Sequence, residues 1–389
     1  MYRTRRLPLS LRLLKASPVK TFAATAGICF ANVLVFFEMG LLNAIYQSQE
    51  RPYSLLDGEI VLVSNLFTRL SQAPGILKSD VMRAQGLEGI EKVSALSITS
   101  GTVLVLPNGY TTSAQVYAID PLNSALNPVR AKLDLDAISL YERAAIDRLS
   151  SPLYVKNVTG ILVKNQDYQT NLGNGRLFIN STASIGSTFA ADYSLVMSND
   201  NLTNYYPDHN PGLVSIGVAK IKKGYSTQRV LKGLIDLYPK GYSIQVYTVP
   251  QIAAIESDYW RKHTTLSFIF GLGVLVGFVV SGVILYQILY SDVVSHIGEY
   301  ATLLALGYTK AFIARTVFSQ AILLTLMAFP FAIGISVTLY AVLSTTTNLL
   351  IYMTASRAAT VLILGSLTSF LSGYLATGQL RKADPSTLY

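Results

Sequence analysis

The stretch TTLSFIFGLGVLVGFVVSGVILYQILYS, residues 264–291, decides the class of this protein. It has 28 residues without a single charge, and about 20 apolar residues already suffice for a helix to cross the hydrocarbon core of a bilayer. Trp260 precedes the stretch, and Tyr286 and Tyr290 lie near its end. Such aromatic residues typically anchor a helix at the membrane interface. The sequence therefore predicts a membrane-spanning helix.

Three further spans follow from the other apolar runs. Residues 21–46 carry one charge, Glu38, and they are too long for the apolar core of a signal peptide and lack a clean cleavage site. Residues 316–356 are 41 uncharged residues, which is too long for one helix, so the polar STTTN at 344–348 is the predicted turn. The predicted division is a basic tail at 1–20, spans at 21–46, 264–291, 316–343 and 354–380, a large domain at 47–263, loops at 292–315 and 344–353, and a tail at 381–389.

Polar and small residues inside the spans have specific expected roles. The carboxylate of Glu38 is a candidate for function because ionisable groups are rare within membranes. The alternative is that Glu38 packs near the outer end of its span and is partly hydrated. Asn32 is interpreted as an interhelical hydrogen-bonding group. Glycines of the second span predict close contact with neighbouring helices, namely Gly271, Gly273, Gly277 and Gly282.

The charge distribution predicts the orientation in the membrane. Charged residues make up 14% of the chain, and six of the basic ones fall within residues 1–20, which contain no acid. Because basic flanks stay on the cytoplasmic side, both termini, with Arg381 and Lys382 at the second, and residues 292–315 are expected inside, and residues 47–263 outside. We therefore expect a multi-pass protein of the inner membrane. Nucleic-acid binding would require basic residues spread over a folded face, and no such pattern is evident.

The large domain, residues 47–263, predicts an α+β fold. EIVLVS at 59–64 predicts a buried strand, and Pro107-Asn108-Gly109 predicts the turn of a hairpin. A strand–helix–strand pattern follows at 213–249. The size admits two lobes. The final stretch, PQIAAIESDYWRKHT, predicts a helix that continues into the second span as a rigid lever.

Catalytic and metal-binding patterns are absent from the sequence. It has no Walker A loop, no HExxH and no GxSxG motif. The single cysteine, Cys29, excludes an intrachain disulfide, and the three histidines match no metal-ligand spacing. Glu256 and Asp258 are expected to be solvated, because residues two apart on a helix do not share a face. The expectation is a protein that is not an enzyme and binds no cofactor itself.

The segment HIGEYATLLALGYTKAFIAR, residues 296–315, predicts a short amphipathic helix on the cytoplasmic side. His296, Glu299 and Thr302 are expected along its polar side, and Gly307 is expected to end it. Its functional interpretation is a docking helix for a cytoplasmic protein, and the alternative is a surface helix without a partner. The apolar side is expected to consist of Ile297, Tyr300, Leu303, Leu304 and Leu306.

The stretch EYATLLALGYTKAFI resembles the signature that follows the second span in FtsX-like, MacB-type ABC permeases, and its tyrosines are most similar to the DevC family. AGICFANVLVFFEMGLLNAIY, LLDGEIVLVS, VYAIDP and RKADPSTLY resemble the same family in the same order. The resemblance implies four transmembrane helices and a large MacB-like α+β periplasmic domain between the first two.

The resemblance also implies partners. It implies a homodimer, a separate cytoplasmic ATPase subunit that holds ATP and magnesium, a periplasmic adaptor and a TolC-like outer-membrane channel. ATP-driven motion would pass to the periplasmic domain and export a glycolipid or another hydrophobic substrate. The ATPase-coupling residues would be those of the docking helix: His296, Glu299, Tyr300, Thr302, Leu303, Leu306 and Gly307. A lipoprotein-releasing permease and a membrane sensor or signalling subunit remain alternatives.

Overall fold

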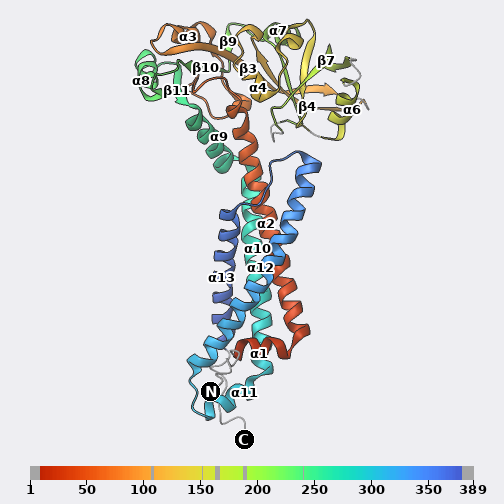
Figure 1. Cartoon of the computed structure of the whole chain (residues 1–389), viewed down its shortest axis with the longest axis vertical. Helices are drawn as coiled ribbons and strands as arrows, with labels where there is room; N and C mark the ends of the chain where they lie inside the picture. Colours follow the sequence, from red (N-terminus) through yellow and green to blue (C-terminus); the bar gives the residue numbers. More distant parts are fainter. Residues whose placement is uncertain are drawn as a thin grey trace. The chain divides into compact units, whose positions relative to one another are not determined.

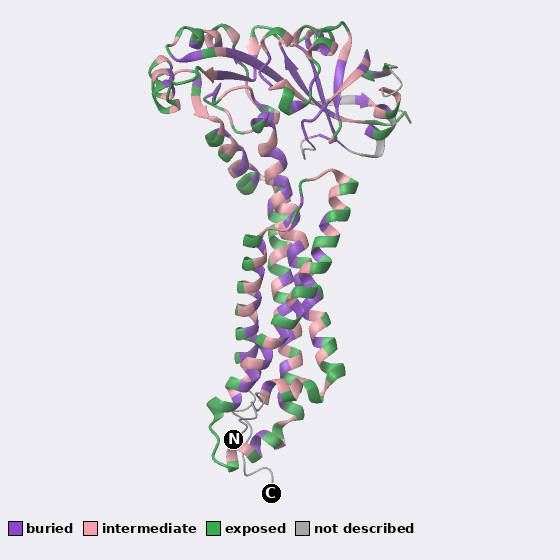
Figure 2. Cartoon of the chain, in the orientation of Figure 1, coloured by how far each residue is buried: buried purple, intermediate pink, exposed green. Residues whose placement is uncertain are grey.

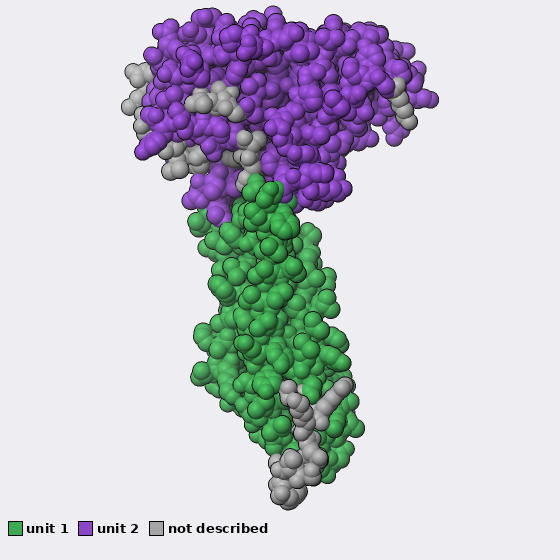
Figure 3. All heavy atoms as spheres, turned by 180° about the vertical axis from the view of Figure 1, so that it is seen from behind, with its two compact units in different colours: residues 1–43, 265–342, 351–389 green, residues 44–264, 343–350 purple. Residues whose placement is uncertain are grey.

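The computed structural model describes residues 9–106, 109–150, 152–162, 167–186, 191–239 and 241–378. Two compact units share the chain, coloured separately in Figure 3. We call residues 1–43, 265–342 and 351–389 the helical unit, and residues 44–264 and 343–350 the α/β unit. The predicted turn residues Pro107 and Asn108 and several basic residues used for the orientation lie outside the described residues, namely Arg3, Arg5, Arg6, Arg381 and Lys382.

Within the described residues, four helices are long and apolar enough to cross a membrane, as predicted. In Figure 1 they are labelled α2, α10, α12 and α13. Two short helices, α1 and α11, belong to the same helical unit. The bounds are α1 Leu9–Ala16, α2 Pro18–Ser54, α10 Thr265–Ser295, α11 Ile297–Ala305, α12 Lys310–Thr347 and α13 Ala355–Thr377.

The helices α2 and α12 extend beyond the apolar runs at both ends. Hydropathy marks only the part of a helix suited to the membrane, whereas backbone hydrogen bonding continues into polar residues. The STTTN stretch illustrates the difference, because α12 runs through it to Thr347 and the chain turns at Asn348, where φ is 56°. The hydroxyls of Thr346 and Thr347 donate to the carbonyl of Leu343, so they fit inside a helix.

Close packing of α2 against α10 depends on two glycines. A Cβ atom at Gly277 would lie 2.6 Å from Val35, and one at Gly273 would lie 2.6 Å from the carboxyl carbon of Glu38. Both contacts are too short for any larger side chain, because real Cβ atoms essentially never come so close. The predicted role of these glycines is therefore confirmed.

Close packing also joins α10 to α13. The Ser372 hydroxyl donates a 2.8 Å hydrogen bond to the carbonyl of Gly282, a contact that small residues permit between membrane helices. Gly271 differs from the other glycines of α10, because an added Cβ there would meet nothing within 4 Å. For Gly271 the prediction of a close helix contact is wrong.

The α/β unit is built on a nine-stranded sheet. The strands are β1 Ile60–Ser64, β3 Ile90–Val105, β4 Thr111–Ile119, β5 Arg143–Asp147, β6 Tyr168–Leu172, β7 Gly175–Ala183, β8 Tyr193–Ser198, β10 Ile216–Ile221 and β11 Ile244–Thr248. Their order is β11-β1-β10-β3-β4-β8-β5-β7-β6. The pairs β4–β8 and β5–β7 are parallel, and the other pairs are antiparallel. A small second sheet pairs β2 Ile76–Leu77 with β9 Leu213–Val214.

Helices and short turns of 3-10 helix connect these strands. The helices are α3 Lys78–Arg83, α4 Pro128–Ala131, α5 Leu135–Ser139, α6 Pro152–Leu162, α7 Asn199–Tyr205, α8 Thr227–Leu237 and α9 Val249–His263, and the 3-10 turns are η1 Leu70–Gln72, η2 Ala84–Gly86 and η3 Pro121–Asn123.

The predicted strands and hairpin are present. Every residue of β1 is buried, as its continuous apolar run indicates, and Figure 2 shows buried residues along the strands of the sheet. β3 and β4 form the predicted hairpin, and β10, α8 and β11 form the predicted strand–helix–strand unit. The alternative of two lobes is not observed, because one sheet runs through the unit.

The predicted continuous helix into the second span is wrong. α9 ends at His263, and α10 begins at Thr265. Thr264 between them has φ −108° and ψ 138°, which is extended backbone. No glycine or proline marks this junction, so the local sequence did not reveal the break. By contrast, α2 is one helix from Pro18 to Ser54.

Candidate functional site

The predicted docking helix is α11, and it ends as expected. Gly307 has φ 90°, the left-handed conformation that glycine adopts without strain. The amide of Gly307 donates to the carbonyl of Leu304, and the amide of Tyr308 donates to the carbonyl of Leu303, both at 3.0 Å. This pair of bonds is a Schellman motif, which terminates the helix at this glycine.

The side chains of α11 differ in their exposure. Glu299 and Thr302 are exposed as expected. Leu306 was predicted on the apolar side but is 72% exposed. Ile297 was predicted there as well and is also exposed, whereas Tyr300 is buried and Leu303 is half-buried. The exposed face therefore combines an acid and a hydroxyl with aliphatic side chains. Burial also raises the pKa of the Tyr300 hydroxyl.

His296 faces α10 rather than the exposed face, which corrects its predicted position. Its Nδ1 lies 2.9 Å from the carbonyl oxygen of Asp292 and 3.4 Å from Oδ1 of the same residue. Oδ2 of Asp292 accepts a 3.0 Å hydrogen bond from Gln320 Nε2 on α12. A small cavity of about 30 Å³ lies beside these groups and is also lined by Lys20. Sequence reasoning missed Asp292 and Gln320, although Asp292 is the first charge after the uncharged stretch 264–291.

The two intramembrane candidates, Asn32 and Glu38, lie near glycines of neighbouring helices. Asn32 is 1% exposed, and its Oδ1 has no hydrogen-bond partner within the described residues. A Cβ at Gly365 of α13 would lie 3.9 Å from that oxygen. Glu38 is half-buried beside Gly273. The surroundings of Glu38 agree with the packing alternative. For Asn32, the expected hydrogen bond to a neighbouring helix is not observed at Oδ1 within the described residues.

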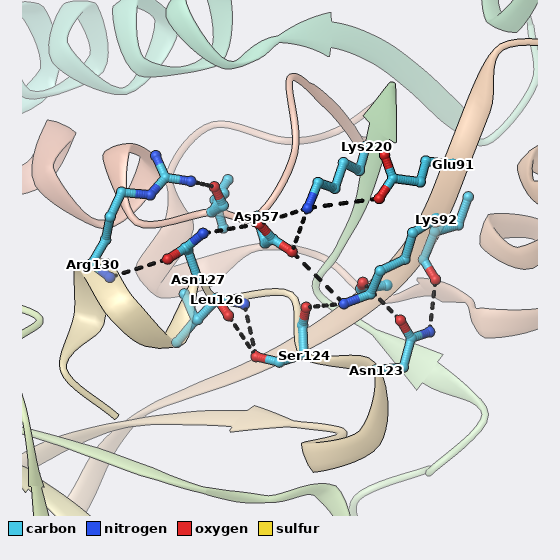
Figure 4. Close-up of polar contacts among 12 residues, drawn as sticks. Asp57, Glu91, Lys92, Asn123, Ser124, Leu126, Asn127, Arg130 and Lys220 are labelled. Atoms are coloured by element: carbon cyan, nitrogen blue, oxygen red, sulfur yellow. Dashed lines mark hydrogen bonds and ion pairs between the residues drawn. The ribbon is translucent and has the colours of Figure 1, made fainter. Parts of the chain in front are cut away.

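Figure 4 shows a polar network around the C-terminal end of α2 in the α/β unit. The guanidinium of Arg130 donates to the carbonyls of Ser54 at 2.8 Å and Leu56 at 2.6 Å. Ser54 is the last residue of α2, and a cation at a helix C-terminus is stabilised by the orphan carbonyls and the helix dipole. Arg130, which belongs to α4, therefore links that helix to the end of α2 and to Leu56 just beyond it.

Asp57 extends this network to the sheet. Its carboxylate lies 3.4 Å from Lys220 Nζ on β10 and 3.8 Å from Lys92 Nζ on β3, and it accepts a 3.0 Å hydrogen bond from Asn127 (Figure 4). Burial lowers the pKa of Lys92, against the opposing effect of Asp57. Lys92 also donates to the carbonyl of Ser124 at 2.9 Å. These groups satisfy one another, so the network is a structural link between α2 and two strands.

The prediction that Glu256 is solvated is wrong. Glu256 of α9 is only 1% exposed, whereas the side chain of Asp258 is 50% exposed and pairs with Lys262 at 2.9 Å. Oε2 of Glu256 accepts hydrogen bonds from the Tyr53 hydroxyl at 2.9 Å and the Leu70 amide at 2.7 Å. Burial raises the pKa of Glu256, while its hydrogen-bond donors lower it. Only tertiary contacts with α2 reveal this burial.

Comparisons with known proteins identify the C-terminal part of the chain. Residues 271–385 match the family described as FtsX-like permease C-terminal. A search of curated proteins gave no match. The periplasmic region of MacB from Actinobacillus actinomycetemcomitans is a similar solved structure, with 13% identity and a TM-score of 0.34 over 55% of this chain and 96% of that one. The extracellular domain of the noncanonic ABC-type transporter YknZ from Gram-positive bacteria matches with 12% identity and a TM-score of 0.33, over 49% of this chain and 98% of that one. Residues 271–385 of this chain therefore match the FtsX-like permease C-terminal family.

Proposed function

We propose that the chain is the membrane subunit of a MacB-type ABC exporter. In this proposal a separate ATPase subunit binds the exposed face of α11, and its motion reaches the α/β unit through the helices. The export substrate would be a glycolipid or another hydrophobic molecule, delivered through a periplasmic adaptor and a TolC-like channel. Two copies of the chain would act together, with both termini in the cytoplasm.

The observation that carries the proposal is the arrangement of contacts along α2. In the first turn of α2, Lys20 donates a 3.3 Å hydrogen bond to Ser295. Ser295 is the last residue of α10, and only His296 separates it from α11. At the other end of α2, Arg130 donates a hydrogen bond to the carbonyl of Ser54, and Glu256 accepts one from the hydroxyl of Tyr53. A helix transmits displacement along its axis because its backbone is hydrogen-bonded from turn to turn. These contacts suit α2 to carrying motion between the two units.

The exposed face of α11 supports a protein partner. Leu306 is 72% exposed and Tyr308 is 48% exposed beyond the Schellman turn. The ring of Tyr308 lies 4.9 Å from that of Phe312, which is itself 39% exposed. Exposed aliphatic and aromatic side chains of this kind have the composition of an interface centre.

Affinity purification of the full chain from native membranes tests the proposal. We expect a cytoplasmic ATPase subunit to co-purify, and Leu306→Asp to reduce the recovered ATPase by at least tenfold. Leu122→Asp is the matched control, because Leu122 is a 99% exposed leucine in the α/β unit and should leave recovery unchanged. Recovery of the same amount of ATPase with Leu306→Asp would contradict the docking role of α11.

A further inference from the structure

We propose that Glu256 is a positioning residue that fixes α9 to the end of α2, so that the two helices move as one body. The inference deepens the proposed function, because a domain driven through α2 must hold that helix firmly. The contacts that carry it all lie inside the α/β unit.

Glu256 joins three segments that are distant in the sequence. Oε2 accepts hydrogen bonds from Tyr53 on α2 and from the amide of Leu70 on η1. Oε1 accepts a 2.9 Å hydrogen bond from Trp260 Nε1, one turn further along α9. One carboxylate therefore accepts from α2, from η1 and from its own helix.

Because the Glu256 carboxylate is buried, its removal should lower the stability of the folded protein. Glu256, Tyr53 and Trp260 are 1%, 1% and 7% exposed. Hydrogen bonds to a charged group stabilise a protein more than neutral ones do, and a buried donor that loses its acceptor incurs the full desolvation penalty. Removing the carboxylate would leave the donors of Tyr53, Leu70 and Trp260 without this acceptor at once.

A second contact restrains the angle between α2 and α9. The guanidinium of Arg261 on α9 lies 5.0 Å from the ring centre of Tyr46 on α2, a cation–π geometry. Tyr46 and Tyr53 are seven residues apart, or about 10 Å along a helix. A single contact would leave the two helices free to pivot, whereas two contacts at this spacing restrain their angle.

The extended residue between α9 and α10 explains why α9 needs this attachment. Because Thr264 has φ −108° and ψ 138°, α9 does not take its direction from a helix continuous with α10. The hydroxyl of Thr264 donates a 2.6 Å hydrogen bond to the carbonyl of Trp260, the residue that also contacts Glu256. The position of α9 is therefore set by contacts inside the α/β unit, among which Glu256 supplies the buried link to α2.

Distance measurements between spin labels test the inference in the full-length permease in lipid nanodiscs. Labels are placed on Ser54→Cys of α2 and Ala254→Cys of α9, both exposed positions, in a Cys29→Ala background. We expect a narrow distance distribution for the parent protein. Glu256→Ala should widen it at least twofold, Tyr53→Phe should widen it less, and Glu256→Gln should restore part of the order because it retains one acceptor oxygen.

Asp258→Asn is the matched control, because it removes an exposed acid from the same helix and should leave the width unchanged. Far-UV circular dichroism and the elution volume in gel filtration report whether each variant is folded, because Trp260 itself contacts Glu256. An unchanged width in folded Glu256→Ala overturns the inference; if that variant does not fold, an unchanged width in both Tyr53→Phe and Glu256→Gln overturns it. The measurement needs no ATPase, so loss of ATPase co-purification with normal distances would contradict only the proposed function.

Discussion

The hydroxyl of Tyr53 donates a 2.9 Å hydrogen bond to Oε2 of Glu256, although the two residues are 203 positions apart in the sequence. Each residue belongs to a different helix, α2 for Tyr53 and α9 for Glu256. Both side chains are 1% exposed. This contact joins α2 directly to α9 inside the α/β unit.

Tyr53→Phe should lower the free energy of unfolding of the α/β unit by about 1–3 kcal/mol, because a buried carboxylate loses one donor. Chemical denaturation followed by Trp260 emission measures the change. Tyr247→Phe is the control, since its hydroxyl donates to Gln245 at an exposed position. Equal stability of Tyr53→Phe and the parent protein would show that the hydrogen bond contributes nothing.

The α/β unit should gain stability through Glu256 as the pH falls. Burial raises the pKa of Glu256 above its ordinary value of 4.5 in the folded state, so the native protein binds this proton more readily than the unfolded chain does. The contribution is fully present below pH 4.5 and is lost as the pH rises through the raised pKa. Denaturation between pH 4.5 and 7.5 should show a less negative slope of stability against pH in Glu256→Gln than in the parent.

Asp258→Asn controls for the loss of an acid from α9. Its slope should match that of the parent, because Asp258 is half-exposed and pairs with Lys262 at the surface. The predicted sign is wrong if Glu256→Gln has a more negative slope than the parent.

Gly277→Val should destabilise the helical unit, because its Cβ would lie 2.6 Å from Val35. Overpacking of this kind costs about 1–3 kcal/mol, and the thermal midpoint in detergent should fall. Gly271→Val lies on the same helix but would meet nothing within 4 Å. Similar midpoints for the two variants would show that α2 and α10 are not in close contact at Gly277.

Gly307→Ala should destabilise the last turn of α11 through backbone strain alone. An added Cβ meets nothing within 4 Å, but φ at this position is 90°, and a non-glycine residue in the left-handed region costs about 1–2 kcal/mol. Hydrogen exchange of the amides in residues 303–308 should therefore accelerate. Gly298→Ala is the opposite control: it has open space and lies within α11, where alanine is favoured over glycine, so exchange in the helix should slow.

The candidate residues differ in whether local or long-range contacts determine their positions. Gly307 was predictable because its role depends on a turn of a few residues, and the Schellman bonds reach only to Leu303 and Leu304. His296 was placed wrongly because a helical wheel does not show which neighbouring groups a side chain contacts. The contacts of His296 depend on where α10 ends, and Asp292 is held in addition by Gln320 on α12.

The sequence by itself determined the class of the protein, the four spans, the large domain between the first two and the ends of α11. These features depend on local composition, because every apolar run of sufficient length has the same favourable transfer into a bilayer. Only the tertiary structure decided that Glu256 is buried, that Thr264 interrupts the path from α9 to α10, and that α2 is held by Arg130 and Glu256. Those outcomes depend on contacts between residues far apart in the chain, and local patterns do not encode which distant donors a carboxylate will meet.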